Sequence, residues 1–410
     1  MKRMMRMALL MAVAAGTMLV AAGARAEDTQ AHSQVYGYVM MDAGYNDKAI
    51  NPDWFDVQRP SRLPSYDNQF GKDGSTFFSV RQTRFGIKSW TPTSKGELKT
   101  TFEFEMFGVG ADAGQTTIRL RHAYGEMGKW GAGQTWSPFM DIDVFPNTLE
   151  YWGPNGMVFF RNVQVRYMPI QGDTRMTIAL ERPGASGDAG VHSDIVAAGN
   201  LKARFPLPDL SAEYHRAIPK GYVELAGIVR RIQWEDLSTS PTSDLSGNVT
   251  GWGLNASSNL KFSTNVLRLQ VVYGEGIENY MNDAPVDVGT KANPSSVSTP
   301  VVGVALPVTG VVAFLDHTWN ERTTSSIGYS RCDIDNSEGQ AADAFKNGQY
   351  VLANVLCTPV SNVMAGVEVG WIHRENKPAV SPATSAFSVD DYHVQVSFKY
   401  NFSFNVGGGQ

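Results

Sequence analysis

The sequence contains few of the features that mark soluble enzymes or helical membrane proteins. Beyond residue 26 there is no run of 18 apolar residues, which excludes a membrane-spanning helix. Nucleophile motifs of the G-x-S-x-G type, phosphate-binding loops and metal-ligand clusters are also missing. The seven histidines are scattered without ligand spacing. We therefore expect no catalytic activity, no cofactor and no metal site.

Basic residues are fewer than acidic ones, at 35 against 40, so the formal net charge is −5. Four of the basic residues lie in the first 26 positions, and without them the formal net charge falls to −9. An acidic chain of this kind is not expected to bind nucleic acid. The total says nothing about placement, and an interior surface could still be basic.

The N-terminus has the layout of a secretory signal peptide. Lys2, Arg3 and Arg6 precede an apolar stretch over 7–22, and Ala24-Arg25-Ala26 forms an A-x-A cleavage site. The alternative is a membrane anchor helix, but the apolar stretch is short and ends in small residues. We expect residues 1–26 to be removed, which makes this an exported protein.

The C-terminal segment 392–404 alternates strictly between apolar and polar residues. Its apolar positions, each two residues apart, are Tyr392, Val394, Val396, Phe398, Tyr400, Phe402 and Phe404. Side chains of a strand alternate between its two faces, so one face is apolar and the other polar. Soluble strands usually have about five to six residues, whereas crossing a bilayer takes roughly nine to eleven. Only a closed barrel pairs every backbone group of such a strand in lipid.

Sixteen segments have strand character, which predicts an all-β fold: a transmembrane antiparallel β-barrel over 27–404 with about 16 strands. Their approximate bounds are 34–45, 77–90, 97–107, 116–127, 130–137, 158–168, 174–182, 210–217, 221–235, 250–261, 265–275, 310–319, 322–334, 349–358, 362–374 and 390–404. Long and short connections alternate, as expected for long extracellular loops and short periplasmic turns. Residues 405–410 would form a short periplasmic tail.

Individual strands support this pattern with one exception. In 97–107, Phe102 and Phe104 share the face opposite Glu103 and Glu105. In 77–90 the alternation places Arg81 on the lipid-facing side, which predicts either a β-bulge or a position above the membrane. Polar His122, His215 and His393 are expected to face the lumen.

Two smaller features are tested against this strand assignment. Cys332 and Cys357 fall at opposite ends of one predicted hairpin, too far apart for a disulfide, so we expect both to be unbridged. Asp333, Asp335 and Asn336 suggest calcium, but Glu338 occupies the position where an EF-hand loop needs glycine. We expect a solvated loop there.

Four segments carry a resemblance to a known family. The first, Ser79 to Lys88, resembles the second strand of trimeric general porins. The other three are more specific: Arg119-Leu-Arg-His-Ala-Tyr-Gly-Glu126, Gly133-Gln-Thr-Trp-Ser-Pro-Phe-Met-Asp141 and Leu267-Arg-Leu-Gln-Val-Val-Tyr-Gly-Glu-Gly276. Together they are similar to the DcaP-like trimeric outer-membrane porins. The resemblance implies a homotrimeric sixteen-stranded channel in outer-membrane lipid, taking up small organic anions such as dicarboxylates.

The porin pattern folds the third outer loop into the barrel, where the narrowest ring sets rate and selectivity. That loop maps to 138–157 and contains Asp141, Asp143 and Glu150, with aromatic residues and prolines that suit a packed loop. The alternative is an ordinary exposed loop.

Inward positions of the predicted strands near this loop are rich in arginine, which stays charged and binds carboxylates through two parallel hydrogen bonds. Their carboxylate partners could be Glu103, Glu105 and Asp141, in which case the arginines only stiffen the barrel; both roles can coexist. The candidate pore-lining residues are Arg84, Lys88, Glu103, Glu105, Arg119, Arg121, Asp141, Asp143, Arg166, Arg175, Arg230 and Arg268.

Two other functions remain open at this point. A non-conducting receptor or adhesin barrel would suit the long loops 46–76 and 276–309. An outer-membrane hydrolase would need a serine or acid near a histidine on one rim, which the sequence does not locate. Outward aromatics such as Tyr36, Phe398 and Phe402 could lie at a trimer interface or in a lipid-facing girdle.

Overall fold

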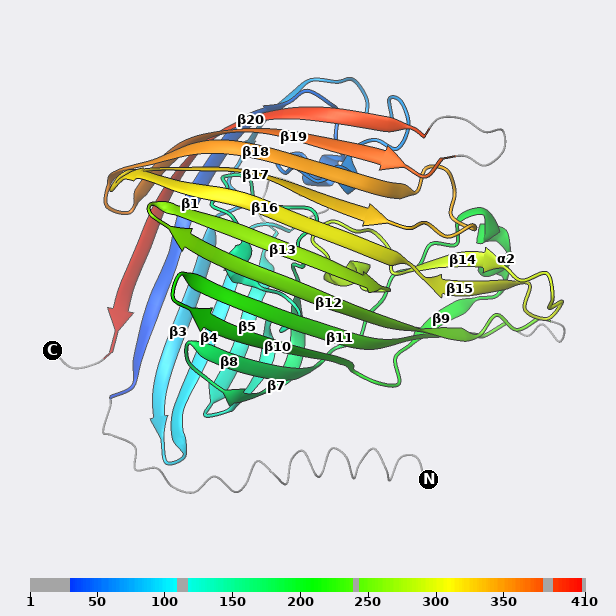
Figure 1. Ribbon diagram of the computed structural model, residues 1–410, viewed down its shortest axis with the longest axis horizontal. Helices are drawn as coiled ribbons and strands as arrows, with labels where there is room; N and C mark the ends of the chain where they lie inside the picture. Colours follow the sequence, from blue (N-terminus) through cyan, green and yellow to red (C-terminus); the bar gives the residue numbers. More distant parts are fainter. Residues whose placement is uncertain (1–29, 109–116, 239–242, 379–385, 408–410) are drawn as a thin grey trace.

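Sixteen antiparallel strands close into a barrel in the computed structural model, which describes residues 30–108, 117–238, 243–378 and 386–407 (Figure 1). The predicted sixteen-stranded fold is confirmed; the predicted signal peptide lies outside the described residues. The barrel strands are β1 His32–Asn46, β3 Arg84–Thr93, β4 Gly96–Glu105, β5 Arg119–Met127, β6 Trp130–Trp136, β7 Arg161–Ile170, β8 Thr174–Glu181, β10 Asp209–Ile218, β11 Gly221–Asp236, β12 Gly247–Phe262, β13 Asn265–Glu275, β16 Pro307–Asn320, β17 Thr323–Ile334, β18 Phe345–Val360, β19 Val363–Asn376 and β20 Ser388–Val406.

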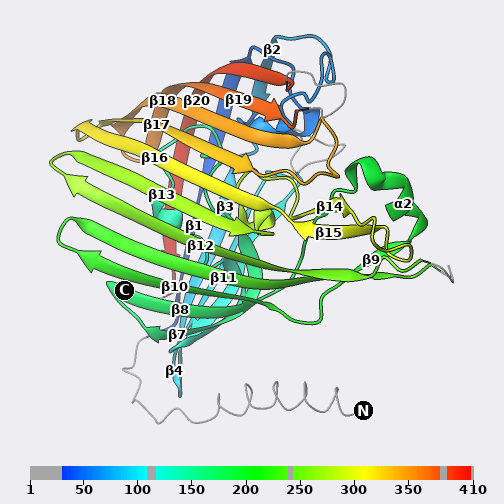
Figure 2. The ribbon, with the colours of Figure 1, turned by 45° about the vertical axis from the view of Figure 1, so that its right-hand side comes forward.

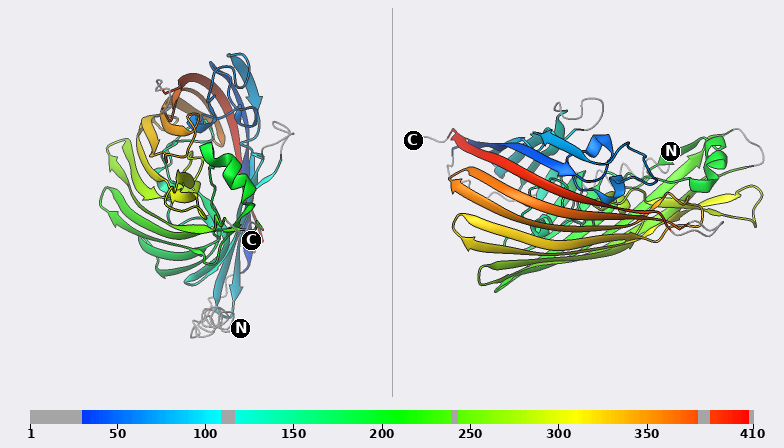
Figure 3. Two further views of the ribbon diagram at one scale, coloured as in Figure 1. Left: turned by 90° about the vertical axis from the view of Figure 1, so that its right-hand side faces the viewer. Right: turned by 90° about the horizontal axis from the view of Figure 1, so that it is seen from above.

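The ring closes where the first and last strands pair. On one side β1 pairs with β3, and on the other it pairs with β20 from Ser33↔Val406 to Asn46↔His393. The view along the barrel in Figure 3 shows this ring of strands. Val406 still pairs with Ser33, so β20 extends two residues beyond the end at Phe404 expected from the sequence.

The two ends of the barrel differ, as predicted. At one end the strands are joined by short turns, such as 94–95 and 128–129, and at the other by long loops. The loops contain further elements: β2 Ser75–Ser79, β9 Leu201–Arg204, β14 Val288–Ala292, β15 Val301–Ala305, helix α2 Ser193–Ala198, and 3-10 helices η2 Pro52–Trp54, η3 Pro60–Arg62, η4 Ile142–Val144, η5 Gly190–His192 and η6 Glu278–Tyr280. Figure 2 shows α2 and the β14–β15 hairpin projecting from this loop end.

Strand side chains alternate between an exposed outer face and a buried inner face. In β20, Tyr392 and Phe398 are 60% and 52% exposed, whereas Gln395 and Ser397 are fully buried inside. The three histidines expected in the lumen are all buried. Tyr36 is a correction: it lies on the inward face of β1 and donates a hydrogen bond to Glu103 (2.8 Å), so it is not an outward aromatic.

The predicted irregularity near Arg81 is a bulge in the pairing with β1, made by residues 80–83 between β2 and β3, where the Thr83 N–H donates to the Val80 carbonyl (2.9 Å). β1 pairs with β3 up to Tyr38↔Arg84 and with β2 from Asp42↔Ser79. Residues 80–83 therefore lie opposite residues 39–41, so this segment has one residue more than β1. The bulge turns Arg81 away from lipid, and its guanidinium donates to Asp56 (2.7 Å) with no exposed surface.

The interior of the barrel is divided into two unlike parts. Inward residues of β11 to β18 form an apolar surface that the loops cover, here named the covered wall: Ile228, Val272, Val312, Phe314 and Leu352. Loop residues Phe139, Val144 and Met157 pack on it in one hydrophobic cluster. Burial of this apolar area fixes the loops against one side and leaves the opposite side free of them.

The two cysteines behave as expected. Cys332 is buried, Cys357 is exposed, and both are free thiols.

Candidate pore constriction

Loop 137–160 crosses the barrel interior and is anchored to the inner faces of distant strands. At its start the Asp141 carboxylate accepts hydrogen bonds from Tyr222 of β11 (2.7 Å) and Ser257 of β12 (2.6 Å). Further along, the backbone N–H groups of Leu149 and Glu150 both donate to Glu368 of β19, each at 2.7 Å. The loop is therefore held inside the barrel rather than exposed at its rim.

Glu150 organises the middle of this loop. Its carboxylate accepts hydrogen bonds from the backbone N–H groups of Gln58 (3.2 Å), Trp152 (2.8 Å) and Gly153, and from the Tyr350 hydroxyl (3.2 Å). Burial raises the pKa of Glu150 to about 8, although these donors oppose the shift. The group therefore takes up a proton more readily than an exposed glutamate.

Opposite the loop, three arginines converge on two glutamates to form what we name the charged wall: Arg84 of β3, Glu103 and Glu105 of β4, and Arg119 and Arg121 of β5. Arg121 donates to Glu103 (2.5 Å) and Glu105 (2.9 Å), and Arg119 donates to Glu105 (2.8 Å). Arg84 lies 3.4 Å from Glu105 and 3.8 Å from Glu103. Three fixed positive charges against two glutamates leave a surplus of one.

A second bulge explains how Arg121 reaches both glutamates. The register of β4 and β5 passes from Glu103↔His122 directly to Phe104↔Leu120, so Arg121 is the extra, unpaired residue. The bulge turns both Arg121 and its neighbour His122 inward, where a regular strand would present only one of them. Tyr151 of the loop contacts Glu105, Arg119 and Arg121, and so joins the loop to the charged wall.

Three cavities follow one another between the loop and this wall. The cavity toward the turn end, about 610 Å³, shares Arg84, Arg121 and Ile142 with a middle cavity of about 260 Å³. The middle cavity shares Tyr151 and Phe159 with a cavity of about 420 Å³ toward the loop end. The shared residues show that the three cavities adjoin in a row along the barrel, and the middle cavity is the smallest of them.

The other sequence-predicted residues fall in different places. Lys88 and Arg166 line the cavity at the turn end. Arg175 lies on the far side, 2.9 Å from Glu224 and 4.0 Å from Asp143. Asp141 contacts none of the wall arginines, contrary to one of the pairings considered from sequence.

Two predicted arginines are occupied by partners of their own. Arg230 is 2% exposed, with Asp209 and Asp287 each at 2.9 Å, so its guanidinium is not available to a solute. Arg268 donates to Asp316 (2.6 Å). Neither lines the three cavities.

Sequence reasoning missed three arginines of the loop-end cavity. Arg59 and Arg62 come from the loop before β2, and Arg161 begins β7 on the same parity as outward Val163. Arg59 is stacked between Trp54 (4.3 Å) and Trp152 (3.7 Å). The signal that could have found Arg59 and Arg62 is segment 54–62, in which arginines, proline and tryptophan occur together within a predicted loop.

Two kinds of feature are absent from the described residues. No group of three or more His, Cys, Asp or Glu side chains there could hold a metal ion. Among the same residues, no helix is long and apolar enough to cross a membrane.

A closed barrel with a hydrated, loop-narrowed interior defines a porin-type channel of the bacterial outer membrane. A family model described as DcaP outer membrane protein matches residues 21–385. The chain belongs to the DcaP outer membrane protein family, as its sequence motifs suggested. It is a channel protein of the outer membrane, and neither the receptor nor the hydrolase alternative is supported.

Solved structures agree on the fold. The outer membrane channel DcaP of Acinetobacter baumannii matches with a TM-score of 0.75 at 20% identity, over 93% of this chain and 100% of that one. An anion-selective porin from Comamonas acidovorans matches with a TM-score of 0.56 at 9% identity, over 91% and 100%. The trimer form of OmpT from Vibrio cholerae matches with a TM-score of 0.55 at 13% identity, over 91% and 99%. No curated protein matches the sequence.

Proposed function

We propose that this channel prefers small organic anions, such as dicarboxylates, and that residues 138–157 form its constriction against the charged wall. The observation that carries the proposal is the excess of cations along the route. Only Glu103, Glu126, Glu150 and Glu278 supply carboxyl groups to the linings of the three cavities. The basic side chains in the same linings are Arg59, Arg62, Arg84, Lys88, Lys99, Arg119, Arg121, Arg161, Arg166 and Lys399.

Two of the four arginines that line the loop-end cavity, Arg62 and Arg161, are not engaged in an ion pair within the described residues. Both line the loop-end cavity, where a solute arriving from outside enters. Two guanidinium groups at one cavity suit a molecule with two carboxylates, since each can form paired hydrogen bonds with one of them. Water around the half-buried groups keeps the binding weak enough for release.

The test is the reversal potential in a planar bilayer under a KCl gradient. We expect the wild-type channel to favour Cl⁻ and the double variant R62Q/R161Q to lose at least about half of that preference. R204Q is the matched control, because Arg204 is an exposed loop arginine outside the three cavities. Cation selectivity in the wild type would overturn the proposal, as would equal selectivity in the double variant.

Uptake itself is measured by liposome swelling with a panel of dicarboxylates and sugars of similar size. We expect dicarboxylates to enter faster than neutral sugars in the wild type, and the difference to shrink in R62Q/R161Q. Equal rates for both classes in the wild type would reduce the protein to a general diffusion pore.

We also infer that the channel is a homotrimer whose barrels meet at the short-stranded side. β6 has seven residues and β8 has eight, fewer than the roughly nine to eleven needed to cross a bilayer. Next to this side, Phe85, Phe102, Phe104 and Phe402 form an outward aromatic ridge with ring centroids 5.6–6.3 Å apart. A second copy would shield the short strands, while the remaining outer face contacts lipid. The trimer form of OmpT supports the same assembly.

Native mass spectrometry tests the assembly. We expect trimers for the wild type and monomers for F102K, since a charge would be buried between barrels. V229K is the matched control because Val229 is similarly exposed, at 54% against 49%, on the other side of the barrel. Monomeric wild-type protein, or trimeric F102K, would contradict this interface. The same spectra test signal removal, which predicts a mature chain that begins at Glu27.

A further inference from the structure

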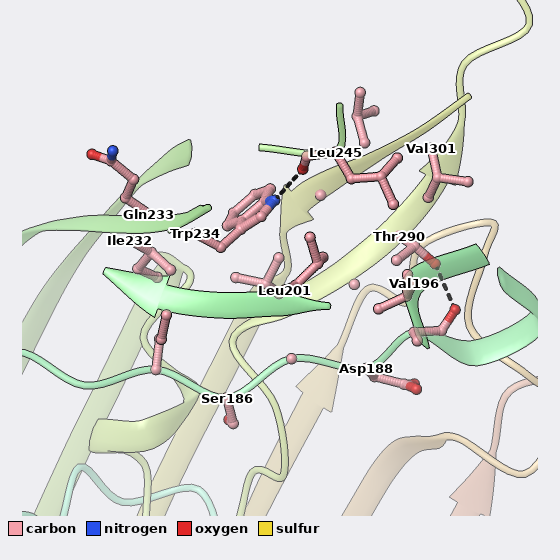
Figure 4. Close-up of a pocket in the computed structure, with 18 of the residues that line it drawn as sticks. Ser186, Asp188, Val196, Leu201, Ile232, Gln233, Trp234, Leu245, Thr290 and Val301 are labelled. Atoms are coloured by element: carbon pink, nitrogen blue, oxygen red, sulfur yellow. Dashed lines mark hydrogen bonds between the residues drawn. The ribbon is translucent and has the colours of Figure 1, made fainter. Parts of the chain in front are cut away.

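A second kind of cavity lies at the loop end, away from the route just described. It measures about 350 Å³, and none of its lining residues lines the three pore cavities. Its walls come mainly from loop segment 185–189, α2, β9 and the β14–β15 hairpin, together with the outer end of barrel strand β11 (Figure 4). The cavity is therefore a product of the long loops, and its position at their end opens it to the outside of the cell.

The lining is largely apolar and is built around one indole ring. Leu201, Leu245 and Val301 surround Trp234 in Figure 4. Two glycines make room for the ring: a Cβ at Gly303 would lie 2.4 Å from the indole, and one at Gly247 would lie 2.7 Å from it. The ring is further fixed because its Nε1 donates to the carbonyl of Leu245 (2.7 Å). Packing and a hydrogen bond thus hold the indole in one orientation at the cavity wall.

Three of the polar side chains in the wall already have partners, and Lys202 is exposed. The Thr290 hydroxyl donates to the carbonyl of Ala189 (3.0 Å), and Asp188 accepts from Gly190 and Gln340 (2.9 and 3.0 Å). The Ser186 hydroxyl lies 3.0 Å from Asn279. A polar or charged molecule would therefore find few unused donors or acceptors there and would lose its hydration without replacement. Gln233 extends away from the indole (Figure 4).

The volume of the cavity limits which ligands could fit. An apolar cavity of about 150 Å³ takes a benzene molecule, so about 350 Å³ suits roughly two rings. Ligand pockets in proteins start near this volume and have the same mixture of apolar walls and a few polar groups. We propose that this loop-end cavity binds an uncharged apolar molecule of about two fused rings, which stacks on Trp234. This role is separate from anion transport.

The experiment is photoaffinity labelling of the full-length channel with an uncharged naphthyl diazirine, mapped by mass spectrometry. We expect labels on β9, near Trp234 and on β15, which excess naphthalene suppresses because the site saturates. Outward residues of β20 serve as an internal control, since lipid-partitioned probe labels them without saturation. Labelling of the cavity that naphthalene does not suppress, or no labelling there, would overturn the proposal.

Two filling variants sharpen the result. V196W fills the cavity from α2, and I195W adds the same bulk on the neighbouring, exposed residue of that helix. We expect cavity labelling to fall at least about fivefold in V196W and to stay at the wild-type level in I195W. V301F fills the cavity from the opposite wall and should give the same loss if V196W disturbs α2. Anion selectivity should be unchanged in all three, so failure here leaves the transport proposal intact. Wild-type labelling in both filling variants would contradict the site.

Discussion

The charged wall and the covered wall belong to one barrel, yet one has charged side chains beside cavities and the other has apolar side chains beneath loops. On the charged wall, Arg84 and Arg121 line a cavity and are balanced by glutamates on the neighbouring strand. On the covered wall, the equivalent inward positions are apolar, as with Val312 and Phe314, and loop residues pack over them. A porin-type interior is therefore not uniformly polar. Where a loop excludes water, the inner face follows the rules of a soluble core.

This difference explains where the route runs. A loop that buries apolar residues on one wall is held there by the free energy of that burial. The space that remains lies against the opposite wall, where the charges of Glu103, Glu105 and Arg121 are kept because they pair with one another. The position of the narrow cavity is thus set by the apolar side as much as by the arginines.

The largest effect should come from removing apolar bulk from the covered wall. Phe314 is 1% exposed and packs near Tyr350, so F314A should lower the free energy of unfolding by about 3–5 kcal/mol. K88A on the charged side removes a long, exposed side chain and should change the free energy of unfolding by less than about 0.5 kcal/mol. Urea unfolding in detergent micelles compares the two. Equal losses would mean that the covered wall is not a core.

Next in size is the loss of the loop anchor at Glu368. E368A leaves the N–H groups of Leu149 and Glu150 without their acceptor, at about 1–3 kcal/mol for each unpaired group. The loop should detach, and we expect a rise of at least about twofold in single-channel conductance with more current noise. E375A is the control on the same strand, because Glu375 forms only a partly exposed ion pair with Lys346. An E368A channel with wild-type conductance would show that other contacts suffice to hold the loop.

Much of the barrel could be predicted from the sequence because lipid imposes a strict rule. Segment 265–275 was predicted with its observed bounds, since outward Leu267, Leu269 and Val271 alternate with inward Arg268 and Gln270. A bulge was one of the two explanations predicted for Arg81, because the alternation would otherwise have placed that charge in lipid. Because lipid requires an apolar side chain at every second residue, each strand can be predicted from its own sequence.

The site was harder to predict because it depends on contacts between distant segments. Arg161 shares the parity of lipid-facing Val163, and only the neighbouring loop explains why it lines a cavity instead. Arg230 looked like a pore residue by parity, but Asp287 from a loop far along the chain pairs with it. Tyr36 was misjudged because β1 carries aromatics on its inward face. The odd or even position of a residue in a strand shows on which side of the sheet its side chain lies. The loops that cover that side determine which groups the side chain contacts.

A smaller effect should follow from changing the charge balance at the charged wall. In R121A, Glu103 and Glu105 keep only Arg84 and Arg119, so the surplus positive charge disappears. We expect the Cl⁻ over K⁺ permeability ratio to fall about two- to fivefold, which reversal potentials measure. E103Q changes the balance the other way and should raise the ratio. Shifts of the same sign in both variants would show that shape rather than charge governs selectivity.

The smallest expected effect is a pH dependence that arises from Glu150. Its pKa is about 8 in the folded loop and 4.5 when unperturbed, so the folded protein retains a proton that the unfolded chain releases. Stability should therefore fall as pH rises from about 4.5 through 8 and level off above that. Between pH 6 and 9 we expect the melting temperature of the wild type to drop by roughly 2–5 °C, measured by tryptophan fluorescence, and E150Q to drop by less. D73N is the control, because the Lys48 ammonium holds the pKa of exposed Asp73 below its usual range, and that carboxylate is already ionised throughout the interval. If the melting temperature of E150Q fell with pH as steeply as that of the wild type, a buried group other than Glu150 would be responsible for the pH dependence.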